Sequence, residues 1–181
     1  MAYLDRNTQI NGLPRDARVP HLWVSEGIGV GVLGGAGVAI WFLILDMVTR
    51  EPLYTPAALG SVFFFGAEGP QEIQRNFTTI GGYTILHFAA FMLMGMIFTF
   101  MVEKVQAGPH RWLIALMAFI LLDGLFAGTI AALGAWVIAS IGMWAIIVGN
   151  LIAIFIMAAA LWKTHPRLHD LAQKPVQPTA I

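Results

Sequence analysis

The sequence predicts an all-α protein, a transmembrane four-helix bundle, from its composition and from the distribution of its apolar residues. Of the 181 residues, 58% are hydrophobic and only 11% are charged. Soluble domains carry about 25% charged residues, so this chain has too few polar side chains to cover a surface in water. We therefore expect lipid to be the solvent for most of the chain.

Four apolar runs have the length that a helix needs to cross about 30 Å of hydrocarbon. They are residues 28–48, 80–102, 112–138 and 143–162. The third run is longer than necessary and should tilt or protrude. The third and fourth runs are separated by so few residues that they should form a tight antiparallel hairpin.

The connection between the first two runs, residues 49–79, should have structure of its own. Thr55 followed by Pro56 has the pattern of a helix N-cap with proline at the first helical position. The apolar stretch 56–65 that follows is too short to span a membrane. It is predicted to form a short helix that is either interfacial or re-entrant.

The Lys and Arg residues are divided unequally between the two ends of the predicted spans. Eight flank one end, whereas only Arg50 and Arg75 lie at the other. Positively charged flanks face the cytoplasm, so residues 1–26 and 163–181 should be cytoplasmic segments on either side of a transmembrane domain, residues 27–162. Residues 1–26 lack the apolar stretch of a signal peptide, and the first run should therefore be a retained anchor.

Small residues recur every four positions in the first and third runs. The two stripes are Gly27, Gly31, Gly35 and Ala39, and Gly124, Gly128 and Ala132. This spacing lets another helix backbone approach closely. The partner is either another helix of the same bundle or another protein subunit.

Three polar residues in three different runs fall at similar predicted depths in the membrane. They are His87, Asp123 and Asn150, and Thr84 lies one turn from His87. Polar groups at this depth should face the bundle interior and find partners, so the four residues are a candidate intramembrane polar cluster. The cluster is either a proton or ion relay, or a polar contact to a quinone or pigment, or a set of interhelical hydrogen bonds that holds the bundle together.

Asp46 and Arg50 lie at the end of the first run, four residues apart. This spacing favours an ion pair on one helix face. We expect Asp46 to be a solvated helix-end residue.

The composition and the histidine positions limit the cofactors. The formal net charge is zero, which gives no basic surface for nucleic acid, and no cysteine is present for thiolate sites. Haem held by two histidines needs both at one depth, and only His87 lies within a predicted span. No metal site or cofactor is predicted, although His87 alone remains a candidate ligand for a single haem or pigment.

Three segments resemble a family of uncharacterised bacterial four-helix integral membrane proteins. They are residues 52–60, 86–90 and 149–151, and the similarity runs over most of residues 25–170. The resemblance implies a multi-pass protein of the bacterial inner membrane. It implies no activity and transfers no catalytic residue.

The sequence leaves two classes of function open, since no nucleophile motif or phosphate-binding loop is present. The first is a non-catalytic accessory or structural subunit that packs within a larger bacterial membrane complex, respiratory or photosynthetic. The second is a small transporter or ion- or proton-conducting oligomer that uses the intramembrane polar cluster. Expected partners are the lipid bilayer and other membrane subunits or further copies of the chain. An enzyme with intramembrane chemistry ranks last.

Overall fold

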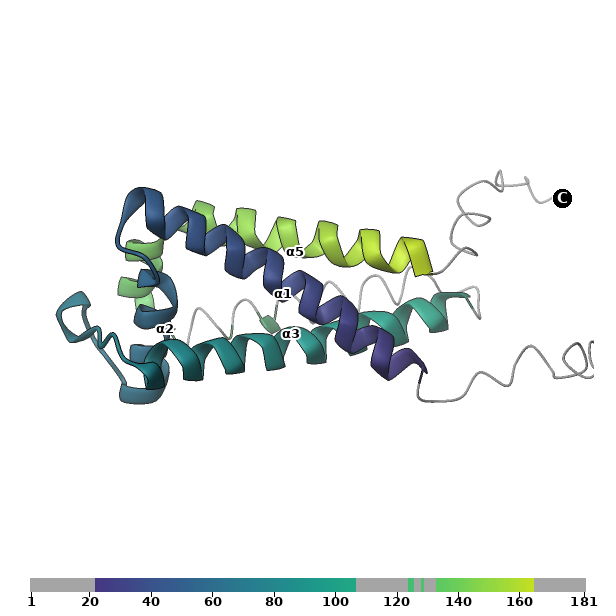
Figure 1. Cartoon of the computed structure of the whole chain (residues 1–181), viewed down its shortest axis with the longest axis horizontal. Helices are drawn as coiled ribbons and strands as arrows, with labels where there is room; N and C mark the ends of the chain where they lie inside the picture. The colour runs from purple at the N-terminus through teal and green to yellow at the C-terminus, as the bar shows by residue number, and fades with distance from the viewer. Residues whose placement is uncertain (1–21, 107–123, 126–127, 129–132, 165–181) are drawn as a thin grey trace, which may run out of the picture.

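The computed structural model describes residues 22–106, 124–125, 128 and 133–164, and these residues are helical apart from short connections. Three long helices, α1 (Leu22–Thr49), α3 (Phe77–Gln106) and α5 (Met143–Thr164), run side by side (Figure 1). A short helix, α2 (Tyr54–Phe65), and a single turn of 3-10 helix, η1 (Pro70–Glu72), lie at one end of the bundle. We call this end the α2 end.

Three of the four predicted spans are confirmed as long apolar helices. α1, α3 and α5 are each long and apolar enough to cross a membrane. Most of the predicted span 112–138 lies outside the described residues. The helical residues 133–141 end at Gly142, whose φ of +91° is in the left-handed region, and α5 begins at the next residue.

α1 is the central helix of the described bundle, because it packs against both α3 and α5. Away from the α2 end, Val30 of α1 forms a core with Met157 and Leu161 of α5, and side chains of α3 pack around it. Near the α2 end, a second core joins Leu59 of α2 to Val137 and Ile141.

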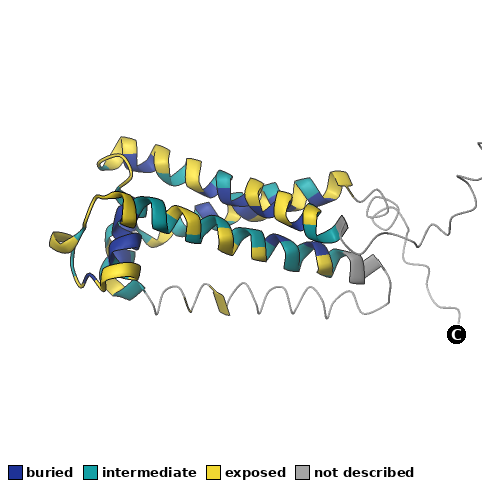
Figure 2. Ribbon diagram, turned by 60° about the horizontal axis from the view of Figure 1, so that its bottom comes forward, coloured by how far each residue is buried: buried dark blue, intermediate teal, exposed yellow. Residues whose placement is uncertain are grey.

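α2 closes one end of the bundle with one buried face (Figure 2). It begins after Leu53, whose φ of +64° is left-handed, and ends at Gly66, whose φ is +65°. Thr55 therefore lies inside the first turn, and its predicted role as the N-cap is wrong. The buried residues are Thr55, Ala57, Ala58, Leu59, Gly60 and Ser61.

Hydrogen bonds attach the connection after α2 to the helices on both sides. The Gln74 N–H donates to Ser61 Oγ of α2 over 2.8 Å, and Thr79 Oγ1 of α3 donates to the Gln74 carbonyl over 2.7 Å. Asn76 caps α3, because its Oδ1 accepts from the Thr79 N–H over 3.0 Å. The segment 66–76 is thereby fixed against the start of α3.

Candidate functional site

Two tryptophan pairs give a scale for depth along the bundle. Trp23 and Trp41 of α1 are eighteen residues apart, and so are Trp144 and Trp162 of α5. This spacing is about 27 Å at 1.5 Å per residue, close to the hydrocarbon thickness of about 30 Å. The Trp41 and Trp144 rings lie 6.0 Å apart near the α2 end. Since tryptophan is enriched at membrane interfaces, we take these pairs as the two levels of the membrane boundary.

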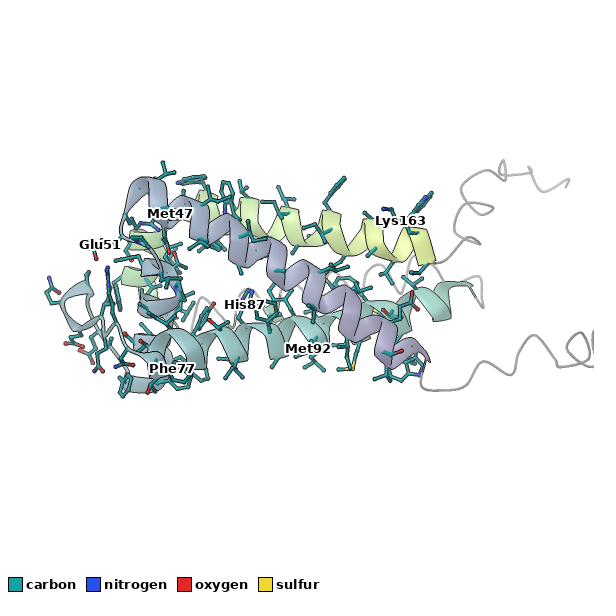
Figure 3. The ribbon with its side chains drawn as sticks, in the orientation of Figure 1. Met47, Glu51, Phe77, His87, Met92 and Lys163 are labelled. Carbon is teal, nitrogen blue, oxygen red and sulfur yellow. The ribbon has the colours of Figure 1, made fainter. Side chains whose placement is uncertain are left out.

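His87 lies between α3 and α1 rather than toward the surroundings of the bundle (Figure 3). Its Nε2 is 3.0 Å from the Gly35 carbonyl oxygen, which can only accept, so Nε2 carries the proton and donates. The ring contacts Phe91, with centroids 4.7 Å apart. Gly35 is six residues from Trp41, which places His87 about 9 Å inside the boundary at the α2 end. Ligation of a haem or pigment through Nε2 would break this hydrogen bond.

The other members of the predicted polar cluster are not joined to His87 in the described part of the chain. Thr84 is exposed, and its hydroxyl donates to its own helix at the Ile80 carbonyl over 2.7 Å. Asn150 is half-buried and lies six residues from Trp144, which is also about 9 Å inside the boundary. Asp123 lies outside the described residues. The full cluster therefore stays a prediction.

Replacing His87 by phenylalanine tests what the bond to Gly35 contributes. We expect the free energy of unfolding to fall by about 0.6–1 kcal/mol, the usual contribution of a hydrogen bond between membrane helices. Thr84→Val is the matched control on the same helix, and its effect should stay within about 0.5 kcal/mol because the exposed hydroxyl contacts only its own turn. Unfolding in mixed micelles, followed by circular dichroism, measures both. Equal losses in the two variants would contradict a stabilising bond.

The first glycine stripe lies at a close contact between α1 and α3. A Cβ atom built on Gly31 would be 2.1 Å from the Phe91 carbonyl oxygen, and one on Gly27 would be 2.5 Å from Met96 Cα. Gly95 of α3 completes the contact, since its Cβ would be 2.1 Å from the Gly27 carbonyl oxygen. Gly35 meets the Phe91 side chain, whereas Ala39 is exposed.

The second predicted stripe is described at two positions only. Gly124 and Gly128 are exposed, and a Cβ at either would meet nothing within 4 Å. Ala132 lies outside the described residues. The described part of this stripe therefore makes no close contact with α1, α3 or α5.

Asp46 forms a polar network that sequence reasoning missed. The side chain is fully buried, so the expected solvated position is wrong, although the predicted pairing with Arg50 is confirmed at 3.1 Å. Both carboxylate oxygens accept further hydrogen bonds from Thr55, Oδ2 from its N–H over 2.7 Å and Oδ1 from its hydroxyl over 2.8 Å. Asp46 thus satisfies a free N–H of the first turn of α2 from outside that helix.

Arg50 extends this network to the other side of the bundle. Its second guanidinium nitrogen donates to the Ile141 carbonyl over 2.7 Å, at the end of the helical residues 133–141. This bond satisfies a carbonyl at a helix end and places a cation there. Asp46 and Arg50 together join α1, α2 and the segment that precedes α5.

A second, exposed ion pair lies beside the first. Arg75 pairs with Glu51, and the guanidinium carbons of Arg50 and Arg75 lie 5.3 and 6.0 Å from the Tyr54 ring centroid. Arginine over an aromatic ring contributes about 0.5–1 kcal/mol at exposed sites. Each of the two arginines at this end therefore has a carboxylate partner and an aromatic neighbour.

Two open hollows of about 320 and 330 Å³ lie beside the connection after α2. The first is lined in part by Phe65, Gln71 and Glu72, and the second in part by Glu68 and Trp136. Ala67 lines both hollows, and its carbonyl accepts from the Trp136 indole N–H over 3.1 Å. Neither hollow is lined by His87 or Asp46.

No protein family, curated protein or solved structure matches this chain in comparisons of sequence and of fold. The resemblance of residues 52–60, 86–90 and 149–151 to bacterial membrane proteins gains no support from these comparisons. Function must therefore be argued from the packing and the polar contacts of the chain itself.

Proposed function

We propose that this chain is a non-catalytic structural subunit that packs within a larger bacterial membrane complex. The observation that carries the structural, non-catalytic part of this proposal is the contact between α1 and α3 at Gly27, Gly31 and Gly95, where the two backbones touch. A contact this close leaves no space for a substrate path between these two helices. It is typical of a rigid helical unit held together by packing.

The polar contacts of other residues in the bundle support the same proposal. His87 and Thr84 each bond to a backbone carbonyl of the bundle, Gly35 and Ile80 respectively. Asp46 is fully buried and bonded to Arg50 and Thr55. The contacts of His87 and Asp46 stabilise the bundle in the positions these residues occupy, and a subunit that contributes structure needs nothing more from them.

The proposed topology has four spans, with residues 112–138 as the third. The segments 1–26 and 163–181 would then face the cytoplasm and the α2 end would face outward, in the bacterial inner membrane. The 8:2 division of Lys and Arg supports this orientation. A reporter enzyme that is active only in the cytoplasm should be active when it is fused after residue 181. One that is active only outside the cytoplasm should be inactive at the same position.

Purification at native expression level tests the proposed role. The tagged chain is extracted from its membrane in a mild detergent, resolved by native electrophoresis and identified with its companions by mass spectrometry. We expect a band several times larger than the 19.7 kDa chain that contains other membrane proteins in fixed ratio. Recovery of the chain only as a monomer or homo-oligomer would refute the proposal.

A small transporter or an ion- or proton-conducting oligomer is the second candidate, and one observation favours it. His87 and Asn150 lie on different helices at the same depth of about 9 Å inside the boundary, which a polar path would require. Asp123 would be its third member. In proteoliposomes, a pH-dependent flux that is lost in Asp123→Asn would support conduction, and the absence of flux in the unmodified chain would exclude it.

A further inference from the structure

The exposed end of α2 carries three consecutive phenylalanines. Phe63, Phe64 and Phe65 are 56%, 40% and 50% exposed, and we call them the phenylalanine patch. The Phe63 and Phe64 rings contact each other edge to face, with centroids 5.1 Å apart. α2 contains no charged residue, so nothing on the helix itself offsets this apolar surface. A patch of this kind in water is unfavourable and marks a contact surface.

The depth of the patch follows from contacts between the helices. The Trp23 ring lies 5.7 Å from the Phe100 ring, which places Phe100 of α3 at the boundary far from the α2 end. Gly82 is eighteen residues before Phe100, the same spacing of about 27 Å that separates the tryptophans of α1 and α5. Gly82 is therefore at the boundary near the α2 end. The Phe64 ring lies against Gly82, since a Cβ there would be 2.9 Å from Phe64 Cε2.

The other end of α2 lies farther from the hydrocarbon. Thr55 is bonded to Asp46, which is five residues beyond Trp41 on α1, or about 7.5 Å outside the boundary. From Thr55 to Phe64 the helix is about 13.5 Å long, and it descends by only about 7.5 Å over that length. The headgroup layer of one leaflet is about 5–8 Å thick. These depths favour an interfacial helix over a re-entrant one.

The surface around the patch joins it to the apolar exterior of α3. Ile85 and Leu93 of α3 are 69% and 57% exposed and follow Gly82 toward the middle of the bundle. Beyond α2, the chain becomes polar at Glu68, Gln71 and Glu72, all exposed. The patch thus lies where the surface changes from apolar to polar, as an interfacial helix requires.

We propose that the phenylalanine patch is seated in the phospholipid headgroup and glycerol layer of the leaflet at the α2 end. α2 is then an interfacial anchor, and phospholipid is the partner that covers its exposed face. Contact of the phenylalanine patch with the headgroup layer fixes the height of α2 above the hydrocarbon. It thereby holds the buried Asp46 network at the membrane surface. This proposal concerns lipid contact, and it holds whether or not the chain is a subunit of a larger complex.

Single cysteines allow a direct test, because the chain contains no cysteine of its own. Phe63→Cys and Phe65→Cys are each labelled with a nitroxide and placed in phosphatidylcholine vesicles. Power saturation in electron paramagnetic resonance then compares how often the nitroxide collides with oxygen and with a water-soluble nickel chelate. Gln71→Cys is the water-exposed control. Phe155→Cys on α5, which is 76% exposed and lies eleven residues inside Trp144, is the hydrocarbon control.

The expected ratio of oxygen to nickel collisions at Phe63 and Phe65 lies between the two controls. A ratio equal to that of Phe155 would mean a re-entrant helix, and one equal to that of Gln71 would mean a water-facing surface. Low accessibility to both reagents would mean that protein covers the patch. Each of these three results would overturn the proposal. If a cysteine variant does not fold, p-benzoylphenylalanine at position 63 keeps the aromatic ring, and photocrosslinking to phosphatidylcholine should dominate over crosslinking to protein or no adduct.

Discussion

Replacing Asp46 by alanine should lower the free energy of unfolding by about 2–4 kcal/mol, because it removes a fully buried carboxylate that pairs with the half-buried Arg50 and accepts from two buried donors of Thr55. The variant leaves the Arg50 guanidinium without its carboxylate. It also leaves the buried Thr55 N–H and hydroxyl without their acceptor. A buried donor without a partner costs about 1–3 kcal/mol. The losses at Arg50 and at Thr55 add up because all of them follow from removing the one carboxylate. Reversible unfolding in mixed micelles, followed by the helical circular dichroism signal, gives the free energy.

Glu51→Ala is the matched control for this result. Glu51 is five residues from Asp46 and also pairs with an arginine, but its side chain is 70% exposed. Exposed ion pairs contribute about 0–1 kcal/mol, so the loss should be below 1 kcal/mol. Asp46→Asn should fall between the two variants because the amide keeps one acceptor oxygen and loses the charge. A similar loss in Asp46→Ala and Glu51→Ala would show that burial of Asp46 contributes nothing.

Asp46 also shows which features the sequence predicts and which it does not. The pairing with Arg50 is a local property, since residues four apart on a helix are neighbours, and it was predictable. The burial of Asp46 depends on a reversal of the chain at residues 50–53, where Leu53 adopts a left-handed φ that is rare for a residue with a side chain. This reversal brings Thr55 back onto Asp46, and no sequence pattern marked it.

The spans were predictable because hydropathy over about 20 residues depends on composition alone. α1, α3 and α5 coincide with predicted runs for that reason. The spacing of a glycine stripe does not reveal which other helix packs against it. The structure places Gly27 and Gly31 against α3, where the matching residue is the single Gly95. A lone glycine gives no periodic signal that would mark it in the sequence.

Replacing Gly31 by alanine should cost about 3 kcal/mol, the upper part of the range for overpacking a close contact. The added methyl group would lie 2.1 Å from the Phe91 carbonyl oxygen and 2.6 Å from Met92 Cα. Both atoms belong to the backbone of α3, so no side-chain rotation relieves the overlap and the helices must separate. The same unfolding measurement in mixed micelles applies.

Two further glycines of α1 serve as graded controls for Gly31→Ala. A methyl group at Gly34 would approach the Met157 side chain at 2.7 Å, and this flexible side chain can move, so the loss should be smaller. A methyl group at Gly29 would meet nothing within 4 Å. Because alanine favours helix over glycine by about 0.8–1.0 kcal/mol, Gly29→Ala should be neutral or stabilising. From the most to the least stable variant, the expected order is Gly29→Ala, Gly34→Ala and Gly31→Ala. The same small change in all three variants would mean that the two backbones do not touch at Gly31, and the main support for a rigid structural subunit would be lost.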